Sequence, residues 1–221
     1  MKETANEKEK ETGVIGKFSV ALGLFDYINP ILYGITAVTL MIRLWGRMNL
    51  PAWILFAAGA ALSLVFGLSI PTVKLIVGLG KMPFRMPVNL VSFVNTGILL
   101  SGTALVSYVV GLRPPVLLLI LLGAAAVIAL LWKKTGRFNT AAVLIGAAGY
   151  LMIYASLITL AVRKGAWLPV VLCAFAICLF VFLCLVGILA NLKNARVHWV
   201  IEISNVVCQA SVALATLLLL L

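Results

Sequence analysis

Glu202 is the side chain whose type and position in the sequence point most clearly to chemistry. It lies within the apolar run that begins near Trp199 and continues to Leu221, whereas the other acidic residues all fall at or before Asp26. An ionisable group at membrane depth costs roughly 3 kcal/mol or more, and such groups usually face a helix-bundle interior or a hydrated cavity. We therefore expect Glu202 to lie in a hydrated interior, where it could bind a cation or exchange a proton.

Glu202 belongs to a stripe of polar residues. His198, Glu202, Asn205 and Gln209 follow one another at steps of four, three and four, which places them on one face of a helix. In a functional interpretation, Glu202 handles a cation or proton, and the two amides supply hydrogen-bond donors and acceptors along a polar path. In a structural interpretation, the stripe joins this helix to its neighbours through hydrogen bonds of about 1 kcal/mol each. Both interpretations stay open for Glu202, and packing fits the amides better.

A second polar line follows the apolar segment from Pro87 to about Gly111. Its serines and threonines are typical of helix packing, and Gly97 and Gly102 allow neighbouring backbones to approach closely. If this helix meets the last one, Asn89 or Asn95 could share a site with Glu202. We therefore expect the polar path to run between the third and the seventh predicted crossing.

His198 is the only histidine in the chain, one helical turn before Glu202. A bis-histidine haem is excluded within this chain, and a zinc centre lacks ligands beyond His198 and Glu202. We therefore assign no catalytic, cofactor-binding or metal-ligating residue, and we expect no cofactor. The structural alternative for Glu202 is a salt bridge or hydrogen bond from His198, from Arg196 or from a basic residue of another helix.

The composition places these residues in a membrane protein. Hydrophobic residues make up 64% of the 221 residues, charged residues 10%, and the mean hydropathy is +1.20, far from the values of soluble domains. Helices are required because backbone groups in lipid must be hydrogen-bonded within the chain. The formal charge of +11 comes from basic residues scattered singly or in pairs between apolar segments, so it indicates membrane topology rather than nucleic-acid binding. We predict an all-α polytopic integral membrane protein, with the lipid bilayer as its partner.

Three regions are predicted along the chain. Residues 1–16 form a polar tail that we expect to be disordered, residues 17–26 form a short interfacial segment, and residues 27–221 form one bundle of about seven transmembrane helices. The predicted crossings are Tyr27–Trp45, Pro51–Ile70, Pro87–Gly111, Pro115–Trp132, Asn139–Val162, Trp167–Ala190 and Trp199–Leu221. All five tryptophans fall at predicted helix ends, where indole rings favour the headgroup region.

The basic residues predict the orientation of the chain. Twelve of them, Lys74 among them, fall on the side of the N-terminus, and five fall on the opposite side. The positive-inside rule then places the N-terminus in the cytoplasm and the C-terminus outside the cytoplasmic membrane. The fourth crossing is the weak point of this count, because the turn at Arg113–Pro115 is very tight and the loss of one span would invert the C-terminal half.

A weak internal repeat permits a 3+1+3 arrangement with parallel repeats. Leu50 and Pro51 open the second crossing as Leu168 and Pro169 open the sixth, and Asn95 in the third crossing corresponds to Asn205 in the seventh. In this layout the chain resembles the seven-helix SWEET-type and PQ-loop transporters, in which an asparagine on the third helix and another on the seventh face a central pocket. The resemblance implies facilitated diffusion of a small neutral solute. The chain departs from the family because it has no Pro-Gln motif and its basic residues favour the reverse orientation.

Several functions fit these patterns. The leading hypothesis is a transporter or channel-like protein that passes a small solute or cation along a path formed by Glu202, Asn205, Gln209 and Asn95. The alternative is a non-catalytic or accessory subunit of a membrane complex, whose polar stripe binds a helix of a partner subunit or of a second copy. A lipid-modifying enzyme that uses His198 and Glu202 ranks below both, because one acid and one histidine are few groups for catalysis.

Overall fold

The computed structural model describes residues 19–80, 88–135, 138–189 and 195–220, and these residues form helices without a strand. The all-α prediction is therefore confirmed for the described part of the chain. The helices are α2 (Val20–Asp26), α3 (Ile28–Leu44), α4 (Leu50–Gly78), α5 (Val88–Val110), α6 (Pro114–Thr135), α7 (Phe138–Arg163), α8 (Trp167–Leu189) and α9 (Ala195–Leu220).

Six helical stretches among the described residues are long and apolar enough to cross a membrane. Helices α2 and α3 together form the first, Val20–Leu44, and the others belong to α4, α5, α7, α8 and α9. Six of the seven predicted crossings therefore have a counterpart, and the chain is a membrane-embedded protein by length and composition. The predicted fourth crossing falls on α6, in which the described residues give a shorter apolar stretch, Pro114–Gly123.

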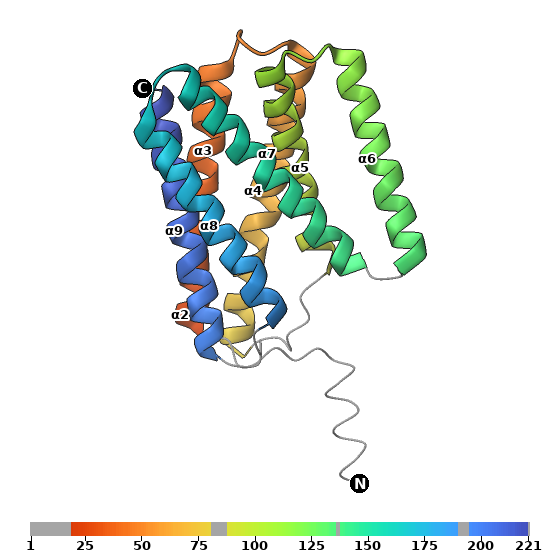
Figure 1. Cartoon of the computed structure of the whole chain (residues 1–221). Helices are drawn as coiled ribbons and strands as arrows, with labels where there is room; N and C mark the ends of the chain where they lie inside the picture. Colours follow the sequence, from red (N-terminus) through yellow and green to blue (C-terminus); the bar gives the residue numbers. More distant parts are fainter. Residues whose placement is uncertain (1–18, 81–87, 136–137, 190–194, 221) are drawn as a thin grey trace.

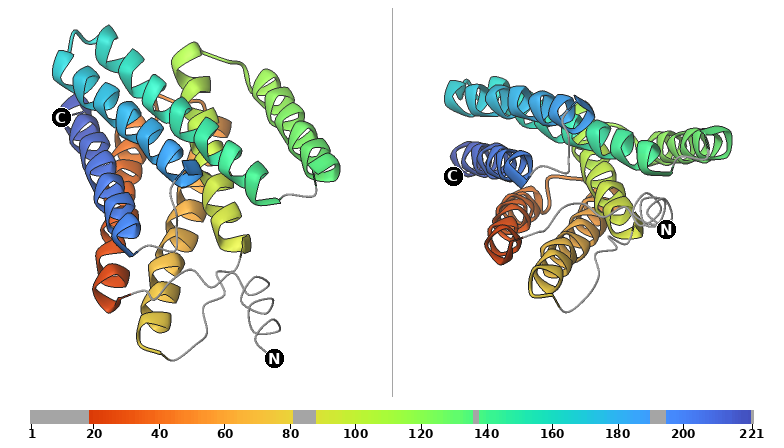
Figure 2. Two further views of the ribbon diagram at one scale, coloured as in Figure 1. Left: turned by 60° about the horizontal axis from the view of Figure 1, so that its bottom comes forward. Right: turned by 90° about the horizontal axis from the view of Figure 1, so that it is seen from below.

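The long helices run alternately up and down. Helix α2, the end of α4 and the start of α9 lie at the same end of the molecule, which we call the polar end (Figure 1). Helix α4 packs on α5, α5 on α7, α8 on α9, and α3 lies against both α4 and α9. Helix α6 stands beside this group and has few contacts with it (Figure 2). The 3+1+3 repeat stays a prediction.

Glycines bring the central helices together. A Cβ atom added to Gly59 of α4 would lie 2.6 Å from the carbonyl oxygen of Gly97 on α5, and one added to Gly149 of α7 would lie 2.6 Å from the backbone nitrogen of Leu99. Backbones this close leave no room for a larger residue. The close approach that the sequence predicts at Gly97 is confirmed.

Two prolines shape the helices around the polar end. Pro30 has no N–H to donate to the carbonyl of Asp26, and the chain turns at Tyr27 between α2 and α3. Pro71 lies inside α4 and likewise leaves the carbonyl of Gly67 without its helical donor. The sequence analysis ended the second crossing at Ile70, which was wrong: α4 continues past Pro71 for two more turns to Gly78.

Candidate functional site

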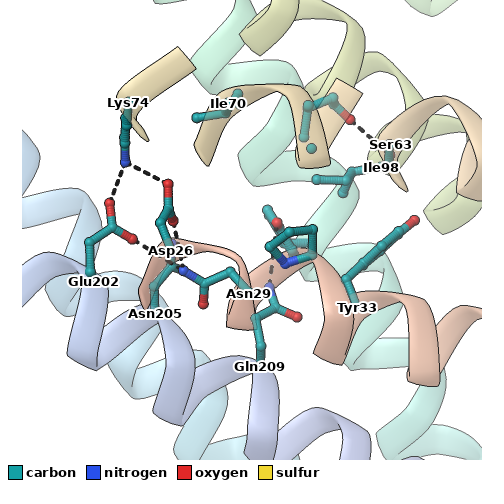
Figure 3. A pocket seen from close by; sticks show the side chains of 14 residues that line it. Asp26, Asn29, Tyr33, Ser63, Ile70, Lys74, Ile98, Glu202, Asn205 and Gln209 are labelled. Atoms are coloured by element: carbon teal, nitrogen blue, oxygen red, sulfur yellow. Dashed lines mark hydrogen bonds and ion pairs between the residues drawn. The ribbon is translucent and has the colours of Figure 1, made fainter. Parts of the chain in front are cut away.

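Lys74 joins two carboxylates from different helices at the polar end of the molecule. Its Nζ atom lies 2.7 Å from Oδ2 of Asp26 on α2 and 2.6 Å from Oε1 of Glu202 on α9 (Figure 3). None of the three side chains is more than 9% exposed. This cluster of Asp26, Lys74 and Glu202, which we call the ion cluster, connects α2, α4 and α9 in the interior of the protein.

Asn29 completes the hydrogen bonding of both acids. Its Nδ2 group donates to Oδ1 of Asp26 and to Oε2 of Glu202, each over 3.1 Å. Each carboxylate therefore has one oxygen on Lys74 and the other on Asn29. The remaining polar atom of this amide, Oδ1, is buried and has no hydrogen-bond partner among the described residues. Buried acceptors without a partner are uncommon in folded proteins, so this atom marks a place where a donor or a cation would fit.

The local sequence explains how the ion cluster forms. A Cβ atom on Gly23 would lie 3.0 Å from the backbone nitrogen of Leu75, so glycine lets α2 approach α4 closely enough for Asp26 to reach Lys74. The turn at Tyr27 is held to α4 by a 2.7 Å hydrogen bond between the Tyr27 hydroxyl and Oγ1 of Thr72. The continuation of α4 beyond Pro71 then places Lys74 in a helix rather than in a loop.

The ion cluster borders a cavity of about 190 Å³. This volume is far above the 10–15 Å³, roughly, that one ordered water needs, so the cavity can hold several waters or a small solute. Its walls come from α2, α3, α4, α5, α7 and α9, and the labelled side chains converge on it (Figure 3). Besides the ion cluster, the lining residues are Asn29, Pro30, Tyr33, Ser63, Gly67, Ile70, Val94, Ile98, Tyr150, Asn205 and Gln209.

Two tyrosines separate this cavity from a smaller one deeper in the protein. Tyr33 and Tyr150 line both cavities, and the second, about 10 Å³ in volume, has room for no more than one water. The tyrosine hydroxyls are weakly held: Tyr33 lies 3.4 Å from Oγ of Ser101, and Nε2 of Gln209 donates to Tyr150 over 3.4 Å. The interior is thus hydratable on the side of the ion cluster and nearly closed beyond the tyrosines.

The structure brings together part of the predicted site. Glu202, Asn205 and Gln209 all line the cavity, in line with their spacing on one helix face. His198 is half-buried one turn before Glu202, and it is not among the lining residues.

The predicted partnership between the third and seventh crossings needs correction. Asn95 on α5 faces α7, where a Cβ atom on Gly146 would overlap its side chain, and it does not line the cavity. The side chain of Asn89 lies outside the described residues. Helices α5 and α9 do not pack on each other within the described ranges, although Val94 and Ile98 of α5 form part of the cavity wall.

The structural alternative for Glu202, a salt bridge from a basic residue of another helix, is present: Lys74 of α4 is that residue. Sequence reasoning did not name it, because it assigned Lys74 to a cytoplasmic loop, and it did not foresee Asp26 as the second acid beside Lys74. One signal was available: Lys74 is flanked by Val73, Leu75, Ile76 and Val77, a setting in which a lone lysine needs an acidic partner.

The arrangement can exchange a positive charge. Two carboxylates face one ammonium group beside a hydratable space, and a carboxylate so placed can take up a proton or a cation. The described residues contain no group of three or more histidine, cysteine, aspartate or glutamate side chains that could hold a metal ion. No protein-family model, no curated protein and no solved structure matches this chain.

Proposed function

We propose that this protein is a transport protein of the cell membrane, which binds a small polar solute or ion in the cavity beside the ion cluster and passes it across the bilayer. The observation that carries the proposal is the buried bridge from Lys74 to Asp26 and Glu202 on the wall of a 190 Å³ cavity. Ionisable groups inside membranes generally mark solute or ion pathways. A purely structural role explains the bridge less well, because apolar packing often replaces buried ion pairs without loss of stability.

The proline positions support the same function. In many transporters, interrupted helices form the binding site, and their freed backbone carbonyls help to hold the solute or a coupling ion. Here Pro30 and Pro71 free the carbonyls of Asp26 and Gly67, and both of these residues line the cavity.

A route through the molecule would pass the ion cluster and then the pair Tyr33 and Tyr150. The tyrosines lie at the inner end of the cavity, and the next cavity that they line within the described residues is about 10 Å³. Passage therefore requires the tyrosines to separate, which their 3.4 Å hydrogen bonds would resist only weakly. If α6 crosses the membrane as the predicted fourth crossing and the N-terminus is cytoplasmic, the ion cluster faces the cytoplasmic side.

Thiol labelling tests this proposal without knowledge of the solute. Cys173, Cys178, Cys184 and Cys208 are first replaced by alanine, and Asn205→Cys is then introduced on the cavity wall. Ile203→Cys is the matched control, because Ile203 lies on the same helix with an exposed side chain that faces away from the cavity. A membrane-impermeant thiol reagent is added to oriented vesicles from one side or the other.

We expect Asn205→Cys to react from both sides, in proportions that depend on which end is open, and Ile203→Cys to react from neither. Reaction of Asn205→Cys from one side only would contradict transport and favour the accessory-subunit hypothesis.

A further inference from the structure

We infer that the ion cluster is a binding site for one monovalent cation, which takes the place of the Lys74 ammonium between Asp26 and Glu202. This inference rests on the proposed function and names the chemistry of what the same site accepts. The cation is defined by its single positive charge and small size; a proton, an alkali metal ion and a small primary ammonium ion all satisfy that chemistry.

The charge balance of the ion cluster is the first argument. Among the described residues that form it, two carboxylates face one ammonium group, which leaves one negative charge uncompensated when all three are ionised. The three side chains are no more than 9% exposed, so water screens this charge poorly. A single added positive charge would neutralise the cluster.

Among the residues that the structure describes, the neighbouring elements supply no further acid or base to the cavity. Helices α5 and α8 contain no aspartate, glutamate, lysine, arginine or histidine, and α3 and α7 present the neutral hydroxyls of Tyr33 and Tyr150. Arg196 and His198 precede Glu202 on α9, and neither is among the residues that line the cavity. The net charge at the cavity wall therefore depends on Asp26, Lys74 and Glu202.

Oxygen atoms in position to receive the cation are the second argument. Both carboxylates are within hydrogen-bond reach of one nitrogen, so a cation at that point would contact both. Oδ1 of Asn29 is buried without a partner beside them. Carboxylate and carbonyl oxygens are the ligands that hard cations prefer.

Lys74 is suited to be displaced rather than to be a permanent partner. Its ammonium group is a point charge on a flexible four-carbon stem, and the residue itself lines the cavity. An incoming cation could therefore occupy the position between the carboxylates while Lys74 moves into the adjacent cavity, so that two positive charges balance the two carboxylates. When the cation leaves, Lys74 returns and keeps the carboxylates paired.

Two measurements on the full-length protein in proteoliposomes test this inference. The first is flux, measured in separate arms for a proton gradient with an internal pH dye, for sodium, for potassium and for radiolabelled methylammonium. The second is acetylation of Lys74 with and without each cation, quantified by mass spectrometry. Lys164 is the internal reference, because it is exposed and its Nζ donates to a backbone carbonyl at the other end of the molecule.

We expect one arm to give flux above that of empty vesicles, and the same cation to raise acetylation of Lys74 at least threefold relative to Lys164. Glu202→Gln and Asp26→Asn should each lower this flux at least tenfold. Both variants leave Lys74 one carboxylate and keep a hydrogen-bonding side chain in place, so the fold should survive in at least one of them. Leu119→Ala, exposed on α6, serves as the control variant and should not change the flux.

Absence of flux in every arm together with constant acetylation of Lys74 would overturn the inference. So would flux that both neutral variants retain. If Asn205→Cys were nevertheless labelled from both sides, the transport proposal would stand and only its cationic substrate would fail. Labelling of Asn205→Cys from one side only would instead contradict the transport proposal itself.

Discussion

At the scale of single residues, the site depends on one lysine that satisfies two acids. The Nζ atom of Lys74 lies 2.7 Å from Asp26 and 2.6 Å from Glu202, and Asn29 donates to the other oxygen of each acid. Replacing one of the three ionised side chains of the ion cluster therefore changes the stability of the protein by an amount that depends on the charges that remain. Loss of the lysine leaves two buried anions, whereas loss of one acid leaves a neutral pair.

This asymmetry predicts the stability of two variants. Lys74→Met should destabilise the protein by about 3–5 kcal/mol, because it leaves buried charges without a partner. Glu202→Gln should cost only about 1–2 kcal/mol, because the pair of Lys74 and Asp26 persists and glutamine can accept a hydrogen bond. Thermal unfolding of the purified proteins in detergent measures both. If Lys74→Met were as stable as Glu202→Gln, the two acids could not both be ionised in the native protein.

At the scale of helices, glycines set the distances that the site needs. Gly59 faces the carbonyl oxygen of Gly97 so closely that an added Cβ atom would lie 2.6 Å from it, and the obstacle is backbone that cannot move aside. Gly59→Ala should therefore destabilise the protein by about 1–3 kcal/mol through overpacking of α4 against α5.

The matched control is Gly123→Ala on α6, where an added Cβ atom meets nothing within 4 Å. This change should be neutral or stabilise the protein by about 0.5–1 kcal/mol, because alanine favours a helix over glycine. Thermal unfolding of the two variants side by side separates the effects, and equal midpoints would contradict the close packing of α4 and α5.

Helix continuity also marks the limit of what the sequence could predict. The polar stripe of Glu202, Asn205 and Gln209 could be derived because helical spacing alone places its members on one face. The partners of Glu202 could not, because Pro71 resembles a helix end in sequence and α4 nevertheless continues to Lys74. Nor could sequence spacing show that Asn95 faces Gly146, since that depends on the packing of α5 against α7.

Pro71 itself should affect accessibility more than stability. Pro71→Ala restores the N–H that can bond to the carbonyl of Gly67, so α4 should become more regular and remain stable. The cavity wall would lose one free carbonyl and part of its freedom to open. We expect labelling of Asn205→Cys to slow severalfold in this background, measured as a thiol-reaction rate. An unchanged rate would show that the backbone hydrogen bond missing at Pro71 plays no part in access.

At the scale of the whole molecule, the ion cluster constrains the membrane topology. Asp26 ends α2, Lys74 lies near the end of α4 and Glu202 near the start of α9, and all three meet at one end of the molecule (Figure 1). Helix α9 can begin at that end only if the chain crosses an even number of times between Asp26 and the start of α9. If helices α3, α4, α5, α7 and α8 each cross the membrane, they give five crossings, and we then expect α6 to cross as well. Its 22 residues span about 33 Å, enough for a bilayer core.

The ends of the protein should therefore lie on opposite sides of the membrane. We expect a reporter fused before residue 1 to be active in the cytoplasm, and one fused after Leu221 to be active outside. A fusion truncated after Gly46, between α3 and α4, should report the outside and serves as the control for a single crossing. Reporters on the same side at both ends would mean that α6 does not cross. Glu202 would then lie at the opposite face of the membrane from Asp26 and Lys74. The ion cluster could not form in that topology, and the proposed cation site would be contradicted.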